Sequence, residues 1–230
     1  MLLKGGLNYI DNGMTCNLRA MHLQTELMAI ASENVNGFDK VGYQRKDPVV
    51  SSFSEYIGVH GLSSAVDDSV GRLLMTENPL DLAIANKGYF QVAGKGGIKL
   101  SRDGRFKVDK QGNLLSLENE KVLANDGTPI KLPIVPEKLE DIKIDLDGNV
   151  RVFNAKTRKL DYVSTISVVT NEGVAVLAPN IRQGFNEYSN VSIEQEFLQA
   201  IPVKRNFEAN RVLFQMQSSL LSTTISKLSS

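Results

Sequence analysis

The sequence predicts an α+β protein in which an N-terminal and a C-terminal helix pair as a coiled-coil-like domain, with an antiparallel all-β domain between them. The first observation is the distribution of glycine, which weakens helix interiors and favours turns. Thirteen of the 18 glycines fall between Gly58 and Gly184. The second observation is a heptad-like spacing of apolar residues at both ends of the chain. The third is a series of short β-favouring runs, separated by turn residues, in the middle.

The N-terminal helix is predicted from Met14 onward, where residues recur at alternating steps of four and three, the spacing of a helix that packs against a partner helix. This row consists of Met14, Leu18, Met21, Thr25, Met28, Ser32 and Val35. A second row of Leu23, Leu27 and Ile30 widens the apolar face and indicates more than one neighbour. Asn36 and Gly37 predict the end of the helix, because both tolerate the left-handed conformation.

The C-terminal helix is predicted to start after Ser192, a residue type that caps helices, with Glu194 and Glu196 in its first turn. Its row is Ile193, Phe197, Ala200, Lys204, Phe207, Arg211, Phe214, Ser218, Leu221, Ile225 and Leu228. We expect a kink or a restart at Pro202, which removes an amide donor. Residues 212–226 carry no charge, which is typical of a helix surrounded by protein rather than by water.

The middle of the chain is predicted to form antiparallel meanders. The expected strands are 82–84, 89–92, 105–108, 142–144, 150–153, 164–169 and 174–177. Turn residues lie between them at hairpin-like intervals, as in Asp126-Gly127 and Asp147-Gly148-Asn149. We therefore expect a helical domain of 1–46 and 189–230, an extended connector over 47–70 and a β-rich outer domain over 71–188.

Composition and charge narrow the classes of function. The 230 residues carry 26 Lys and Arg against 26 Asp and Glu, so we expect no nucleic-acid partner. No stretch approaches the roughly 18 apolar residues of a membrane span, so we expect no membrane-spanning segment. Cys16 is the single cysteine and cannot form an intrachain disulfide. The first six residues lack the basic and apolar regions of a signal peptide, so we expect any export to use another route.

Groups for catalysis or metal binding are few. His22 and His60 have no second ligand at the spacing of a metal site, and Cys16 has no evident His partner. Residues 145–149 have a superficial likeness to a calcium loop, but they lack its distal Glu, so a hairpin turn is favoured. The charges of 44–46 favour a solvated or subunit-contacting cluster over an anion site. We therefore expect no catalytic, cofactor-binding or metal-binding residues, no small-molecule substrate and no enzyme.

Three blocks of sequence span nearly the whole chain. The first block comprises 9–14 (YIDNGM), 32–36 (SENVN) and 41–45 (VGYQR). The second block comprises 78–84 (NPLDLAI), 88–92 (GYFQV), 101–106 (SRDGRF) and 109–114 (DKQGNL). The third block comprises 182–185 (RQGF), 189–192 (SNVS) and 205–210 (RNFEAN). Their residues and their order resemble the flagellar basal-body rod and hook family, the axial proteins of the bacterial flagellum. The second block is the most specific. The chain departs from the usual family pattern at 37–40, Pro202 and Lys204.

The resemblance implies a structural subunit of the flagellar rod, which transmits torque from motor to hook. Such proteins leave the cell through the flagellar type III export apparatus, without a cleaved signal peptide, and stack helically in the periplasm with copies of themselves and other rod and hook subunits. The family's terminal helices form an inner tube and its β domains an outer layer. The short β domain and Asn78-Pro79 favour the proximal rod. A distal-rod or hook-type axial subunit and a monomeric ligand-binding β module are the alternatives.

We expect the terminal segments to be largely disordered in the isolated subunit and to become ordered on incorporation, because their apolar rows lack sufficient partners in a single chain. The predicted assembly seam consists of Met14, Leu18, Met21, Leu23, Leu27, Met28, Ile30, Val35, Ile193, Phe197, Ile201, Phe207, Phe214, Leu221, Ile225 and Leu228.

Overall fold

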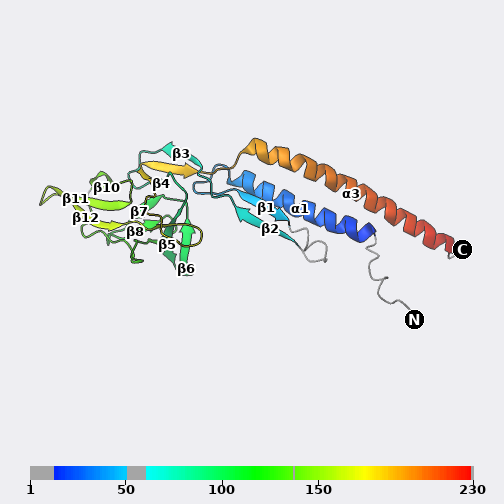
Figure 1. The fold of residues 1–230 in the computed structure, drawn as a ribbon, viewed down its shortest axis with the longest axis horizontal. Coiled ribbons are helices and arrows are strands. Elements are labelled where there is room, and N and C mark those ends of the chain that lie inside the picture. The colour runs from blue at the N-terminus through cyan, green and yellow to red at the C-terminus, as the bar shows by residue number, and fades with distance from the viewer. Residues whose placement is uncertain (1–12, 51–60, 137, 229–230) are drawn as a thin grey trace. The chain divides into compact units, whose positions relative to one another are not determined.

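The structure, a computed structural model, describes residues 13–50, 61–136 and 138–228 (Figure 1). These residues form two compact units. One unit contains the two terminal helices and the described part of 46–65, and the other contains 37–45 and 66–191. Each unit is built from local sequence patterns and is described by itself.

The helical unit consists of two long helices and a short two-stranded sheet. The helices are α1 (Gly13–Gly37) and α3 (Ile193–Leu228), and the strands are β1 (Lys46–Val50) and β2 (Leu62–Val66). Both helices match their prediction from the heptad-like spacing. Figure 1 shows them running alongside each other. The two strands lie within the segment expected to be an extended connector.

The start of α3 follows the prediction, but its interior does not. Ser192 Oγ accepts a hydrogen bond from the amide of Gln195 at 3.4 Å, so Ser192 caps the helix. The helix then continues through Pro202 to Leu228, and the expected restart is wrong. Pro202 and Leu198 both lie on the exposed side of the helix, where water can satisfy the Leu198 carbonyl that loses its amide partner.

The β unit is a set of small antiparallel sheets. Its strands are β3 (Arg72–Met75), β4 (Leu82–Ile84), β5 (Tyr89–Gly94), β6 (Gly97–Ser101), β7 (Phe106–Val108), β8 (Leu114–Ser116), β9 (Lys121–Val122), β10 (Ile142–Ile144), β11 (Asn149–Asn154), β12 (Lys159–Thr165), β13 (Val168–Val169), β14 (Ile181–Gln183) and β15 (Phe185–Tyr188), with a 3-10 turn, η1, at Leu139–Asp141. A six-stranded sheet has the order β13-β5-β9-β8-β7, with β6 paired to β5. The sheet β10-β11-β12 and the pairs β14-β4 and β15-β3 complete the unit.

Most predicted strands are present, and two predictions need correction. The expected strand 164–169 is divided between the end of β12 and the short strand β13. The expected strand 174–177 does not form. The chain turns back at 170–174, where the Thr170 amide donates to the Val174 carbonyl, and so returns to β13. Because β13 has only two residues, a single bridge between Val169 and Ala175 is made. Val174 and Leu177 therefore remain exposed.

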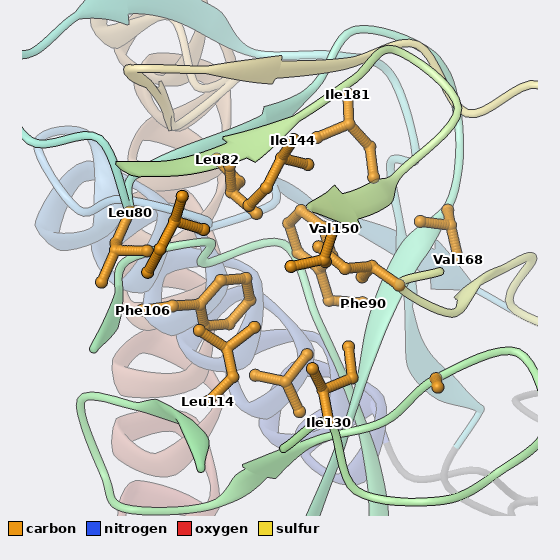
Figure 2. Close-up of a cluster of buried hydrophobic side chains, with 14 of the residues drawn as sticks. Leu80, Leu82, Phe90, Phe106, Leu114, Ile130, Ile144, Val150, Val168 and Ile181 are labelled. Atoms are coloured by element: carbon orange, nitrogen blue, oxygen red, sulfur yellow. The ribbon is translucent and has the colours of Figure 1, made fainter. Parts of the chain in front are cut away.

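The core of the β unit is a continuous cluster of buried aliphatic and aromatic side chains (Figure 2). Phe90 of β5 and Phe106 of β7 meet edge to face, with ring centroids 5.2 Å apart and planes inclined by 80°. Leu82, Val150 and Ile181 contribute from three other strands. The cluster ties the small sheets into one body through apolar burial.

Two hairpins of this unit are closed by the same turn. In 109–113 the Asp109 carboxylate accepts the amides of Gln111 and Asn113, and its second oxygen accepts Asn113 Nδ2 at 2.7 Å. In 145–149 the Asp145 carboxylate makes the same three bonds, with the Asn149 Nδ2 bond at 3.0 Å. Gly112 and Gly148 adopt φ of 86° and 85°, which favours glycine. The turn predicted at 147–149 is therefore confirmed, and the Asp109 and Asp145 carboxylates of the two turns are engaged by amide donors.

Candidate assembly surface of the terminal helices

The contact between α1 and α3 follows a row of buried and partly buried residues on each helix, which we call the inner seam. On α3 it consists of Ile193, Glu196, Ala200, Val203, Phe207, Asn210, Phe214 and Gln217. On α1 it consists of Gly13, Asn17, Ala20, Gln24, Leu27, Ala31 and Asn34. Both rows alternate steps of three and four, so the inner seam has the spacing of a coiled coil.

Side-chain amides cross the inner seam at two levels. Asn17 Nδ2 donates to Gln217 Oε1 at 3.1 Å, and Asn210 Nδ2 donates to Gln24 Oε1 at 3.4 Å. The numbering rises along one helix as it falls along the other, so α1 and α3 are antiparallel. The seam is therefore more polar than the apolar spacing alone would predict.

The C-terminal end of α1 is fixed by Asn34, which is 1% exposed. Its Oδ1 accepts the amide of Lys46 and its Nδ2 donates to the carbonyl of Lys46, both at 2.9 Å. The same Nδ2 lies 3.2 Å from Oε2 of Glu196, the only α3 residue that is buried. Lys46 Nζ also pairs with Glu33. The contacts of Asn34 thus join α1, β1 and the first turn of α3.

Beyond the residues of the inner seam, α3 exposes many large apolar side chains in the described chain. Its exposed large side chains are Phe197, Leu198, Ile201, Val212, Leu213, Met216, Leu220, Leu221, Ile225 and Leu228. We call these residues the outer stripe. Leu198 is 70% exposed and Leu220 is 68% exposed. Exposed apolar side chains gathered on one helix in this number are typical of surfaces that other molecules cover, and charged residues interrupt them between Ile201 and Val212.

A groove of ≈ 440 Å³ runs between the two helices beside the inner seam. Met28, Val35 and Phe197 provide its large apolar side chains, and Ala31 and Ala200 are among the small residues that line it.

The structure distributes the predicted seam residues between partly buried and exposed positions. Met14, Met21, Leu23, Leu27, Met28, Ile30, Val35, Ile193, Phe207 and Phe214 are partly buried. Leu18, Phe197, Ile201, Leu221, Ile225 and Leu228 are exposed. Their part in contacts between subunits stays a prediction.

The sequence reasoning missed the polar members of the inner seam. It followed Phe197, Lys204 and Arg211, whereas the contact with α1 is made one residue earlier in each turn, at Glu196, Val203 and Asn210. The sequence does carry a signal for this polar contact. Asn17 and Gln24 are one heptad apart on the first helix, and Asn210 and Gln217 are one heptad apart on the second. Polar residues at a repeated seam position are a known feature of helix pairing.

The histidine and cysteine side chains were considered for catalysis or metal binding. Nδ1 of His22 lies 3.7 Å from Oε1 of Glu26, one turn further along α1, and Cys16 is exposed. His60 lies outside the described residues. No group of three or more His, Cys, Asp or Glu residues could hold a metal ion in the described ranges. Within those ranges, too, no helix has the length and apolar character needed to cross a membrane.

One buried ion pair lies in the β unit. Arg102 Nη2 is 2.9 Å from Glu187 Oε1, and Arg102 also donates to the carbonyls of Asn86 and Gly88. Burial raises the pKa of Glu187 despite the opposing attraction of Arg102 and the hydrogen bond from the Gly71 amide. The pair holds β15 against the 86–88 turn, which is a structural role.

The chain is similar to proteins of the bacterial flagellum. The family described as the flagellar hook protein FlgE/F/G D1 domain matches residues 83–152, and the family described as the flagellar basal body rod FlgEFG protein C-terminal region matches residues 182–227. Together they match just over half of the chain.

Three relatives match over most of their length. A flagellar basal-body rod protein FlgG of Bacillus subtilis is 25% identical, over 84% of this chain and 88% of the relative. A flagellar basal-body rod protein FlgF of Mesorhizobium japonicum is 27% identical, over 87% and 89%. A flagellar basal-body rod protein FlgF of Caulobacter vibrioides is 26% identical, over 95% and 98%.

Proposed function

Because this chain belongs to the family of flagellar basal-body rod and hook proteins, we propose that it is a structural subunit of the bacterial flagellar rod. The observation that carries the proposal is the outer stripe of α3, whose ten large apolar side chains are exposed in the described chain and include six within the uncharged run 212–226. A surface of this kind is stable in water only when other subunits cover it.

We propose that copies of this chain and other rod or hook subunits cover the outer stripe, so that the terminal helices form an inner tube and the β unit an outer layer. In this arrangement each helix contacts several neighbours, which resists twisting and lets the shaft transmit torque. The same proposal gives the chain a structural role without catalysis. It also assigns 1–46 and 189–230 to the axial core, 47–70 to a connector and 71–188 to the outer domain.

A pair of charges in the outer stripe tests the proposal. In the variant Met216→Glu with Leu220→Glu, two side chains that are exposed in the single chain become anionic. We expect the isolated protein to keep its fold, because neither residue is buried, and to lose incorporation into basal bodies, because a subunit contact would bury both charges. Electron microscopy of basal bodies and a motility assay measure this loss.

A matched variant controls for charge. Gln195→Glu with Asn206→Glu adds the same two charges to exposed polar positions of α3 that precede the uncharged run 212–226. We expect these cells to assemble rods and swim as the parent does. Normal assembly of the Met216→Glu, Leu220→Glu variant would overturn the proposal.

We further propose a proximal-rod position and export through the flagellar type III apparatus without a cleaved signal peptide. The short β unit and Asn78-Pro79 favour the proximal position, while a distal-rod or hook-type position is the alternative. Deleting the gene and imaging the basal bodies separates the two. Loss of the whole rod supports a proximal subunit, whereas a truncated rod that still crosses part of the periplasm supports a distal one.

A further inference from the structure

We infer that the two amide pairs Asn17–Gln217 and Gln24–Asn210 set the register between α1 and α3. The pairs are separated by seven residues on each helix and therefore occupy the same position in successive heptads. Polar residues at a repeated seam position are known to select one register at some cost in stability, because all of them find partners in one alignment only. The inference does not depend on polymerisation.

The level between the two pairs is apolar. In the observed register Ala20 of α1 lies level with Phe214 of α3, so a small side chain stands opposite a large one. Apolar contacts are non-directional and would tolerate sliding of the helices. The amides, together with the Asn34–Glu196 hydrogen bond, distinguish one alignment from the next, because hydrogen bonds require defined partners and distances.

Sliding by one heptad leaves an amide facing an aliphatic side chain in either direction. One slip places Gln24 level with Val203, and the opposite slip places Asn210 level with Ala31. Both amides are partly buried, so an unmatched one loses hydrogen bonding that water does not fully replace. Either slip is therefore disfavoured relative to the observed register.

The functional consequence lies in the groove beside the seam. Met28 and Val35 of α1 line it together with Phe197 of α3, so its shape depends on the axial alignment of the two helices. A slip of one heptad moves these side chains by about 10 Å relative to one another. The amide pairs thus preserve the surface that α1 and α3 present jointly.

Cross-linking of the full-length protein tests the register directly. In a Cys16→Ser background, Ala20→Cys is combined with Phe214→Cys for the observed register, or with Phe207→Cys or Leu221→Cys for registers displaced by one heptad. A short bis-maleimide is the cross-linker. With native amides we expect the 20–214 pair to react at least about tenfold more completely than either displaced pair.

The second arm removes the amides. Replacing Asn17, Gln24, Asn210 and Gln217 by Leu should keep the helices paired and raise the yield of the displaced cross-links to a level comparable with the 20–214 pair. A matched variant with Leu at the exposed positions Thr15, Thr25, Asn206 and Gln215 should retain the single register. Far-UV circular dichroism verifies that each variant remains helical.

Two results would overturn the inference. One is equal cross-linking of the observed and displaced pairs in the protein with native amides. The other is a single register that persists after all four amides are replaced, since apolar packing and the Asn34–Glu196 contact would then suffice without them. If the amide-free variant loses its helices instead, the amides serve stability rather than register, and the inference fails as well.

Discussion

Asn34 shows how one side chain can fix the meeting of three segments. Its amide group satisfies both backbone groups of Lys46 at the start of β1 and contacts the buried carboxylate of Glu196 in the first turn of α3. An amide can do this because it carries an acceptor oxygen and two donor hydrogens. A carboxylate or a hydroxyl of similar size lacks that combination.

Replacing Asn34 should therefore be costly. In Asn34→Ala the backbone groups of Lys46 lose their partner inside the protein, and we expect the free energy of unfolding of the helical unit to fall by roughly 2–4 kcal/mol. Urea unfolding followed by far-UV circular dichroism measures the change. Asn36→Ala is the matched control, because it makes the same substitution at an exposed position of α1 and should be nearly neutral. Equal effects of the two substitutions would contradict the role assigned to Asn34.

The two matching hairpin turns show how an element can be specified locally. Asp109 and Asp145 each accept two backbone amides and one Asn side chain, and each turn places glycine at positive φ. The hydrogen bond from the Asn113 side chain lowers the pKa of Asp109. Burial alone would raise the pKa of Asp145, but the Asn149 hydrogen bonds and the attraction of Arg151 hold it below its usual value. Both turns are thus stabilised by the ionised carboxylate.

The turns should make the β unit sensitive to acid. Because the folded-state pKa of each Asp is depressed, its contribution to stability is complete above the unfolded-state pKa of about 3.9 and is lost as the pH falls through the folded-state value. We expect the urea midpoint of the native protein to fall between about pH 5 and about pH 2, and Asp109→Asn with Asp145→Asn to give a lower midpoint at neutral pH and a flatter profile.

Asp147→Asn provides the control for this profile. Asp147 lies in the second turn, but it takes part through its backbone amide, which donates to Asp145. Its substitution should leave the pH profile unchanged. An acid transition of the same steepness in the Asp109, Asp145 double variant would show that these turns do not govern the response.

The sequence predicts features that depend on neighbouring residues better than features that depend on contacts between distant segments. The bounds of α1 and α3 followed from heptad spacing and from Ser192 and Gly37, and the hairpins followed from their turn residues, because these signals act over a few neighbouring residues. The face of α3 that meets α1 was displaced by one residue, since its polar members Glu196 and Asn210 are identified only by their partners on α1. Similarly, 174–177 has β-favouring residues but lacks a neighbouring strand long enough to pair with.

At the scale of the whole molecule, the two units are stabilised by different means. The β unit contains the buried cluster around Phe90 and Ile166, whereas the described residues of α1, α3, β1 and β2 contribute no side chain to that cluster. The helical unit is held by partly buried contacts and by the hydrogen bonds of Asn17, Asn34 and Asn210. Because fully buried apolar area is the larger source of stability, the helical unit should open at lower free energy.

Limited proteolysis of the dilute protein should reveal this difference. We expect trypsin to cleave first in the helices, at sites such as Arg19, Arg205 and Arg211, and to leave a resistant fragment close to 66–191. The β unit carries exposed lysines, including Lys121 and Lys143, so its resistance would reflect folding rather than a lack of sites. In purified basal bodies the helical sites should be protected, because neighbouring subunits would cover them. Simultaneous cleavage of both units in the dilute protein, or intact helices there, would contradict a helical unit that completes its packing on assembly.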